Sequence, residues 1–315
     1  MLHKKLAIIC TINNQRDHTL RFAEFFTSVD GCGLFLFLDN PDHMQYFTDV
    51  KKPDNLFITA CTDGYWNGVL GHIPVDMPQK QHTNLRHGTQ LARETDYLWA
   101  MSVDSDELIY NLKELVNDVE TLGNDYDMLR LKPAELIHTY TTAYSKETFQ
   151  GIYFKVLQQW PELTKKLERL DPALRKRLEK MKPFTRRLFF GHINGKTLFR
   201  LSAPITTYKQ HKQFSDEREL TLAILPDKYR LLHFDAMNYY SWIFKWHRRI
   251  RGETRATAIS TARQKQTKII ARHLGLFRSF SRRRLFNSWY VYNDQELCQL
   301  LDVGLVERFI INQVR

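Results

Sequence analysis

Two aspartates stand directly after an apolar run, at a spacing that suits a metal ion. Asp104 and Asp106 follow residues 99–103, and Glu107 comes next. On an extended segment, side chains two residues apart point to the same side, so both carboxylates can converge on one ion. Adjacent anions otherwise repel and raise each other's pKa. Mg²⁺ and Mn²⁺ suit carboxylate oxygens, and Mg²⁺ takes much of its shell from water and substrate phosphates. The pair predicts a metal site completed by a diphosphate, although either aspartate could instead cap a helix.

Alternating strands and helices would place this pair at the edge of a sheet. Short apolar runs rich in β-forming residues occupy 6–12, 33–38, 55–62 and 97–103. The segments between them have helical spacing or, at 41–51 and 79–94, helix-compatible sequence. This alternation predicts an α/β fold with a mixed, mainly parallel central sheet flanked by helices. In such sheets ligands bind beyond the carboxyl ends of the strands, and polar residues follow each of the four runs.

The remaining chain predicts further strands and a helical end. Residues 189–205 look like a hairpin that turns at Asn194-Gly195, and 230–234 reads as another strand. Residues 161–187 read as a polar helical insertion or lid. From residue 239 the sequence is helical and basic. We therefore expect the site on a domain over 1–238, followed by a helical basic region over 239–315.

The composition is that of a globular protein. The chain has 315 residues, of which 43% are hydrophobic and 26% charged, so disorder is not expected. It has no apolar run near the roughly 20 residues that cross a bilayer. The first apolar run ends in polar residues without a cleavage site, so we interpret it as a strand rather than a signal peptide. Four scattered cysteines, in no metal-ligand spacing, suggest reduced and mostly buried thiols in a cytoplasmic protein.

The positive charge is concentrated in one segment. The net charge is +11, and between Trp242 and Phe286 there are thirteen Lys and Arg residues against the single acid Glu253. Such a segment attracts phosphates, anionic lipids or nucleic acid. Trp242 and Trp246 share one face at helical spacing, so a membrane-facing helix competes with a solvated basic helix that covers the core.

Several separated motifs resemble one enzyme family. A helical segment with Gln81 and Asn84 precedes a strand that ends in Asp-Ser-Asp-Glu-Leu, and a late segment runs from His233 through Ser241 and Lys245. In this order the motifs resemble those of bacterial family 2-like glycosyltransferases of the GT-A (Rossmann-like) fold, in the D-x-D-E-F/L subgroup. The resemblance covers roughly residues 5–110 and 195–255. The family often has Lys-Asn-Glu after its first strand, where this chain has Asn13-Asn14-Gln15.

The resemblance implies a site that stabilises a departing nucleoside diphosphate. A divalent cation and basic side chains do this electrostatically. Asp104 and Asp106 would hold the ion, directly or through water, and His233 matches the family's late histidine as a further ligand. The basic residues that could reach the diphosphate are Lys245, Arg248 and Arg249.

Other side chains are candidates for the donor and the acceptor. Polar groups at strand ends could bond the nucleobase or ribose, namely Thr11, Asn13, Asp39 and Asn40, and Arg86 could contact phosphate or sugar. An inverting reaction needs a general base, usually a carboxylate. Glu135, after a predicted strand at 128–131, is our candidate; Asp216, Glu217 and Asp235 are alternatives, and a retaining reaction would need none.

The resulting expectation is a metal-dependent glycosyltransferase that moves a sugar from a nucleotide-sugar to a glycan or lipid-linked acceptor. We place it in bacterial surface polysaccharide synthesis, of capsule or lipopolysaccharide, in the cytoplasm and in peripheral contact with anionic lipid at the inner face of the cell membrane. A phosphohydrolase with a strand-end aspartate nucleophile is an alternative, although that class uses its first strand, with Thr or Val where this chain has Leu108. A nucleic-acid-binding protein is the other alternative, resting on basic residues interleaved with Trp242, Trp246 and Phe277; it leaves Asp104–Glu107 unexplained, and we do not expect it.

Overall fold

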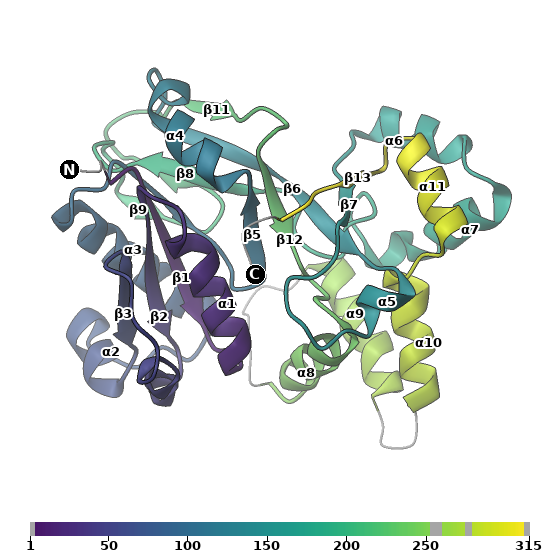
Figure 1. The fold of residues 1–315 in the computed structure, drawn as a ribbon, viewed down its shortest axis with the longest axis horizontal. Helices are drawn as coiled ribbons and strands as arrows, with labels where there is room; N and C mark the ends of the chain where they lie inside the picture. The colour runs from purple at the N-terminus through teal and green to yellow at the C-terminus, as the bar shows by residue number, and fades with distance from the viewer. Residues whose placement is uncertain (1–3, 253–259, 275–278, 312–315) are drawn as a thin grey trace. The chain divides into compact units, whose positions relative to one another are not determined.

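The structure is a computed structural model that describes residues 4–252, 260–274 and 279–311 (Figure 1). The chain forms two compact units. Of the described residues, unit 1 comprises 4–132 and 194–231, and unit 2 comprises 133–193, 232–252, 260–274 and 279–311. The predicted division into 1–238 and 239–315 concerns role rather than compactness and stays a prediction.

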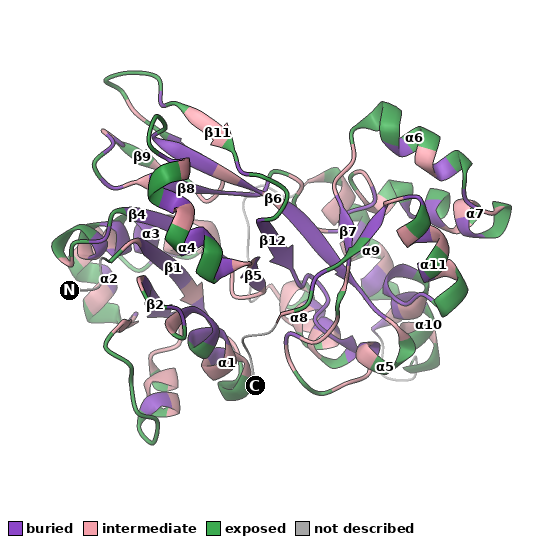
Figure 2. Ribbon diagram, turned by 45° about the horizontal axis from the view of Figure 1, so that its top comes forward, coloured by how far each residue is buried: buried purple, intermediate pink, exposed green. Residues whose placement is uncertain are grey.

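Unit 1 is built on a mainly parallel sheet. Four strands pair in parallel in the order β4-β1-β2-β3. Their bounds are Leu6–Ile12 (β1), Cys32–Leu38 (β2), Leu56–Ala60 (β3) and Trp99–Ser102 (β4). Strands β1 and β2 are buried almost throughout, as expected for apolar strands covered on both faces (Figure 2). Because β4, β1 and β2 are adjacent and parallel, their carboxyl ends lie next to one another.

Antiparallel strands extend this sheet beyond β4. Strand β8 (Lys196–Arg200) pairs with β4 and, on its other side, with the first residues of β6 (Met128–Ile137). Strand β11 (Leu222–Ile224) is parallel to β6. Two shorter strands, β9 (Thr207–Tyr208) and β10 (Gln213–Phe214), form a separate hairpin, and β5 (Glu107–Tyr110) follows β4 in the chain.

Helices flank the unit 1 sheet. They are α1 (Arg16–Thr27), the 3₁₀ helix η1 (Pro41–Phe47), α2 (Asp63–Leu70), α3 (Met77–Glu94) and α4 (Leu112–Leu122). Helix α3 begins where the Asp76 carboxylate accepts the Gln79 N–H, a capping contact that satisfies a free donor of the first turn. It packs against β1. The predicted α/β class, with a mainly parallel sheet flanked by helices, is confirmed.

Unit 2 combines three antiparallel strand segments with helices. The last residues of β6 pair with β7 (Tyr153–Val156), which pairs with β13 (Val306–Arg308). Strand β12 (Arg230–His233) crosses from unit 1 into unit 2. The helices are α5 (Tyr140–Ala143), α6 (Trp160–Glu168), α7 (Pro172–Met181), η2 (Lys182–Phe184), α8 (Tyr239–Ile250), α9 (Thr261–His273), α10 (Ser279–Tyr290) and α11 (Asp294–Asp302). Helix α7 lies within the predicted helical insertion at 161–187, α6 begins one residue before it, and each buries one apolar face.

One expectation from the sequence is wrong, and so are two alternative readings of Trp242 and Trp246. No hairpin forms across Asn194-Gly195, because β8 pairs instead with β4 and β6. Trp242 and Trp246 do not face a membrane or a nucleic acid: they are 0% and 1% exposed and lie in the core of unit 2. Phe277 lies outside the described residues. Among the described helices, none is long and apolar enough to cross a bilayer.

Candidate functional site

The acidic residues after β4 form a tight turn. The Glu107 N–H donates to the Asp104 carbonyl oxygen at 3.0 Å, and the Asp104 N–H donates to the Glu107 carboxylate at 2.7 Å. The segment is therefore a turn rather than the extended strand that we expected, so strand alternation does not orient Asp104 and Asp106. Glu107, which the sequence left without a role, is 4% exposed and closes the turn.

The segment after β1 holds the middle of this turn. Asn14 donates its side-chain amide to Ser105 Oγ at 2.9 Å. His18 Nε2 lies 2.6 Å from the Ser105 carbonyl oxygen, which can only accept, so Nε2 carries the hydrogen. Two strand ends that are far apart in the sequence are thus tied together around residues 104–107, which we call the acidic turn.

A buried lysine lies against the acidic turn. Lys196, the first residue of β8, is 0% exposed, and its Nζ lies 2.9 Å from Asp104 Oδ2 and 3.4 Å from Glu107 Oε2. Burial alone would lower the pKa of Lys196, but the two carboxylates raise it above its ordinary value. Burial alone would likewise raise the pKa of Asp104, and Lys196 lowers it below its ordinary value. Both groups are therefore charged at neutral pH.

Two glutamines complete the surroundings of Asp104. Gln81 of α3 donates to Asp104 Oδ1 at 3.0 Å, and Gln210, between β9 and β10, approaches the same oxygen at 3.5 Å. The neighbouring His211 is anchored through Nδ1, which lies 2.7 Å from the Gly195 carbonyl oxygen. Burial lowers the pKa of His211, and Lys196 adds to this effect. Asp104 thus receives donors from α3, from β8 and from the β9–β10 turn.

Polar groups at the ends of β1 and β2 form a second network of hydrogen bonds, which includes two residues of α3. Asn84, 0% exposed, donates to Thr11 Oγ1 at 2.9 Å and accepts from the Tyr65 hydroxyl at 2.7 Å. Asp39 accepts from the Asn13 amide at 3.0 Å and from Lys80 Nζ at 2.6 Å. The predicted donor-binding residues Thr11, Asn13 and Asp39 are thus all tied into contacts at the strand ends.

Helix α3 supplies three polar side chains that were not among the candidate site residues. Asn84 follows Lys80 by four residues and Gln81 by three, and both spacings place it next to them on the helix surface. The spacing of four residues between Lys80 and Asn84 could have marked Lys80 as a site residue from the sequence alone. The predicted residue Asn40 has a local role, because its side chain accepts the Asp42 N–H and caps η1.

Arg86 lies on another face of α3. It lines an open cavity of about 510 Å³ together with Gly68, Val69, Thr83, His87, Gln90, Arg93 and Tyr208. Positions 86, 90 and 93 point roughly opposite to 80, 81 and 84, given about 100° per residue. The structure therefore does not bring Arg86 to the strand-end networks.

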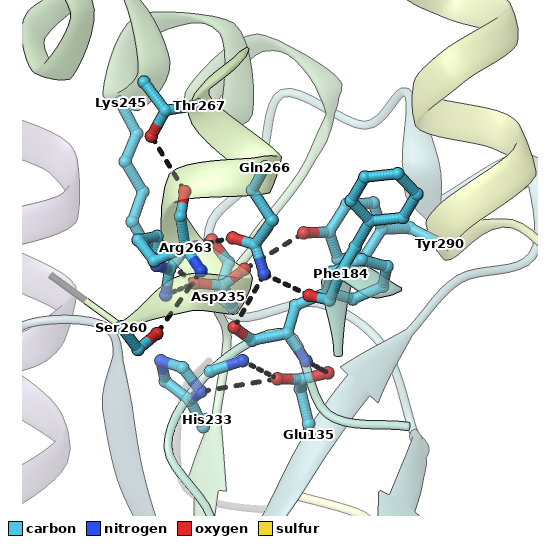
Figure 3. Close-up of polar contacts among 12 residues, drawn as sticks. Glu135, Phe184, His233, Asp235, Lys245, Ser260, Arg263, Gln266, Thr267 and Tyr290 are labelled. Carbon is cyan, nitrogen blue, oxygen red and sulfur yellow. Dashed lines mark hydrogen bonds and ion pairs between the residues drawn. The ribbon is translucent and has the colours of Figure 1, made fainter. Parts of the chain in front are cut away.

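In unit 2, Glu135 is held in the core. It is 0% exposed, accepts N–H groups from Phe190 at 2.9 Å and Gly191 at 2.6 Å, and pairs with Lys155 at 2.6 Å (Figure 3 shows Glu135 and His233). His233 Nδ1 lies 3.9 Å from its carboxylate. These contacts favour a carboxylate that orders the backbone at 190–191, and they lend no support to Glu135 as a general base.

A second buried acid organises the start of the basic helices. Asp235, 3% exposed, accepts from Lys245 Nζ at 3.1 Å and from the Tyr290 hydroxyl at 3.0 Å, and Arg263 lies 3.6 Å away (Figure 3). Burial alone would raise the pKa of Asp235, but Lys245 and Arg263 hold it well below its ordinary value. The predicted phosphate contact Lys245 is thus anchored at Asp235.

The other two predicted basic contacts lie farther along α8. The Arg248 guanidinium lies 5.7 Å from the Phe244 ring centre, and that of Arg249 lies 5.0 Å from the Trp246 ring centre. Contact of Lys245, Arg248 and Arg249 with a diphosphate stays a prediction.

The acidic turn has the donor chemistry of a magnesium or manganese site. A carboxylate has about four lone-pair positions, and the donors named above use up to three positions on Asp104, so accepting capacity remains. Within the described part of the chain, no group of three or more His, Cys, Asp or Glu side chains is arranged to hold a metal. An ion held by Asp104 and Asp106 would need water or phosphate as further ligands. His233 belongs to unit 2, and its place in this site stays a prediction.

Comparison with known proteins finds only a distant structural likeness. The sequence matches no protein-family model and no curated protein. Among solved structures, residues 1–349 of TarS from S. aureus match with 11% identity over 95% of this chain and 78% of that chain, at a TM-score of 0.33. A longer TarS structure matches with 13% identity over 88% of this chain and 44% of that chain, at a TM-score of 0.34, so this chain spans less than half of it. At such TM-scores the likeness carries no argument about function.

Proposed function

We propose that this chain is a glycosyltransferase that moves a sugar from a nucleotide-sugar donor to a glycan or lipid-linked acceptor. The observation that supports this most is the contact between separated parts of the sequence motif. Gln81 from the helical segment donates to Asp104 of the Asp-Ser-Asp-Glu turn, and Asn84 from the same segment donates to Thr11 at the end of β1. These groups lie at carboxyl ends of neighbouring parallel strands, where α/β sheets bind ligands.

The donor nucleotide is proposed to lie along the ends of β1 and β2. Thr11, Asn13 and Asp39 carry hydroxyl, amide and carboxylate groups of the kind that bond a nucleobase or a ribose. Lys80 anchors Asp39 at 2.6 Å, so this carboxylate would be oriented before a ligand binds. Preorganised polar groups lower the ordering cost of binding.

The leaving diphosphate is proposed to lie at the acidic turn. A Mg²⁺ or Mn²⁺ ion held by Asp104 and Asp106 would neutralise charge that develops on the diphosphate. Lys196 keeps Asp104 in its charged form, and Glu107 holds the backbone of the turn. His233 as a further ligand, and Lys245, Arg248 and Arg249 as diphosphate contacts, remain part of the proposal. Synthesis of a bacterial surface polysaccharide, with peripheral contact to anionic lipid, also remains part of it.

A thermal-shift screen tests this function. We expect one class of UDP-, GDP-, CMP- or dTDP-sugar to raise the Tm in the presence of Mn²⁺, and not in EDTA, because bound ligand stabilises the folded state. Asp104→Asn should abolish this shift. Asp54→Asn, an exposed aspartate of unit 1, is the matched control and should retain it.

Two results would contradict the proposal. One is the absence of a shift with every nucleotide-sugar, combined with tight and salt-sensitive binding of an oligonucleotide, which would favour the nucleic-acid alternative. The other is a metal-dependent shift that persists in Asp104→Asn, which would place the donor elsewhere.

A further inference from the structure

The proposed function gives Lys196 a role toward Asp104 but does not explain its second contact, with Glu107. It is 0% exposed, and its two ionic partners are the carboxylates at the two ends of the acidic turn, Asp104 and Glu107. We infer that Lys196 is a built-in counter-cation, a positioning residue that holds the acidic turn together when no metal ion is bound. The inference rests on the proposed function only for the identity of that ion.

The contacts around the turn form a closed ring. Glu107 Oε2 accepts the Asp104 N–H at 2.7 Å and lies 3.4 Å from Lys196 Nζ, and Nζ lies 2.9 Å from Asp104 Oδ2. The ammonium group therefore joins two carboxylates that would otherwise repel each other. A lysine ammonium is a compact point charge, and here it balances acids as a metal ion would, but with one charge and without dissociating.

The fold keeps the ammonium group in place. Strand β8 is paired on both sides, with Met101 of β4 opposite Leu198 and with Leu131 of β6 opposite Lys196. A strand held between two neighbours cannot move its first residue away from the turn without breaking ladder hydrogen bonds. Because a buried ammonium is unfavourable unless it is paired, its position also fixes the two carboxylates.

The inference predicts that loss of the lysine creates a dependence on metal. Lys196→Met keeps an unbranched apolar stem but removes the ammonium group that contacts Asp104 and Glu107. The repulsion can then be relieved by a divalent ion that binds the two carboxylates. We expect the wild-type Tm to be the same in EDTA and in millimolar Mg²⁺ or Mn²⁺ without nucleotide. We expect Lys196→Met to melt several degrees lower in EDTA and to recover at least half of that loss with the metal.

Lys155→Met is the matched control. Lys155 is also buried, at 4% exposed, and pairs with the single carboxylate Glu135 in unit 2. Its loss should lower the Tm as well, but one isolated carboxylate that already accepts two N–H groups offers no comparable ion site. The Tm of Lys155→Met should therefore be the same in EDTA and in Mg²⁺ or Mn²⁺.

A double variant keeps the test decisive if Lys196→Met does not fold. Lys196→Met/Glu107→Gln removes one acid together with the lysine, so it should fold and melt higher in EDTA than Lys196→Met alone. The inference would be overturned if Lys196→Met lost the same Tm in EDTA and in metal and the double variant melted no higher. Lys196 would then be a core residue only. Since no nucleotide is used, this outcome is independent of the nucleotide-sugar screen.

Discussion

Protonation of one buried histidine is expected to govern acid stability. His138 is 0% exposed, and its Nε2 lies 2.7 Å from the Ala236 carbonyl oxygen, so the neutral ring donates there. Burial lowers its pKa to about 4, well below the ordinary value of about 6.5, although the Ala236 contact opposes this effect. The unfolded chain therefore binds the proton more tightly. As the pH falls from about 6.5 to 4, the free energy of unfolding should fall by about 3 kcal/mol from this residue.

Urea unfolding at pH 7.5 and at pH about 4.5 measures this effect. His138→Gln retains an amide donor but cannot be charged, so its free energy of unfolding should change less over this interval than that of the wild type. For each protein, the free energy of unfolding at pH 7.5 is the reference for the value at the lower pH. An equal loss in both proteins would show that other groups cause the acid sensitivity.

The close approach of α3 to β1 and β2 positions both polar networks of unit 1. A Cβ atom on Gly88 of α3 would lie 2.8 Å from Ile9 Cγ2 and 3.0 Å from Phe37 Cε2. Gly88→Ala gains about 1 kcal/mol of helix propensity but overpacks this contact, which costs about 1–3 kcal/mol. We expect net destabilisation by up to about 2 kcal/mol in urea unfolding. We also expect weaker nucleotide-sugar binding, because Gln81 and Asn84 move with the helix.

Gly68→Ala is the control for this prediction. Gly68 lies within α2, and a Cβ atom there would meet nothing within 4 Å. This variant should be neutral or more stable by about 0.5–1 kcal/mol and should bind the donor normally. If both variants are stabilised alike, α3 does not depend on the small residue for its distance from the sheet.

Over the whole molecule, the positive charge is borne by unit 2. Helices α8, α9 and α10 contain no acidic residue, and Lys265, Lys268 and Arg272 of α9 are exposed. We expect the protein to sediment with vesicles that contain anionic lipid and not with zwitterionic ones, and to be released by salt. Replacement of these three residues by Gln should weaken binding by about 1 kcal/mol per charge.

A variant of equal charge change in unit 1 tests whether the location matters. Lys51, Lys52 and Lys113 are exposed there, and their replacement by Gln removes the same net charge. This variant should bind anionic vesicles almost as the wild type does. Equal weakening by both triple variants would show a response to net charge alone, without a membrane-facing surface on α9.

Local patterns in the sequence were sufficient for the parallel strands of unit 1 and for the helix α3. The apolar run at 6–12 coincides with β1, and the helix expected at 79–94 lies within α3, which begins at Met77. Such elements depend on side-chain periodicity and on neighbours a few residues away. The parallel order of the strands follows from the alternation with helices, so the polar residues at 11, 13, 39 and 104 could be expected at one edge. Segment 41–51 was expected to be helix-compatible, and its part Pro41–Phe47 forms the 3₁₀ helix η1.

Contacts between distant segments were beyond the reach of these patterns. Lys196 was predicted to enter a hairpin, but β8 pairs with β4 and β6, and this pairing places the lysine beside Asp104 across 92 residues of sequence. Glu107 and Glu135 gain their roles in the same way, from partners that only the folded chain brings near. Trp242 and Trp246 have a spacing that suits a membrane face and a core face equally, and packing against α9 and α10 buries both. Periodicity identifies which side chains share a face, whereas the free energy of burying that face depends on what covers it.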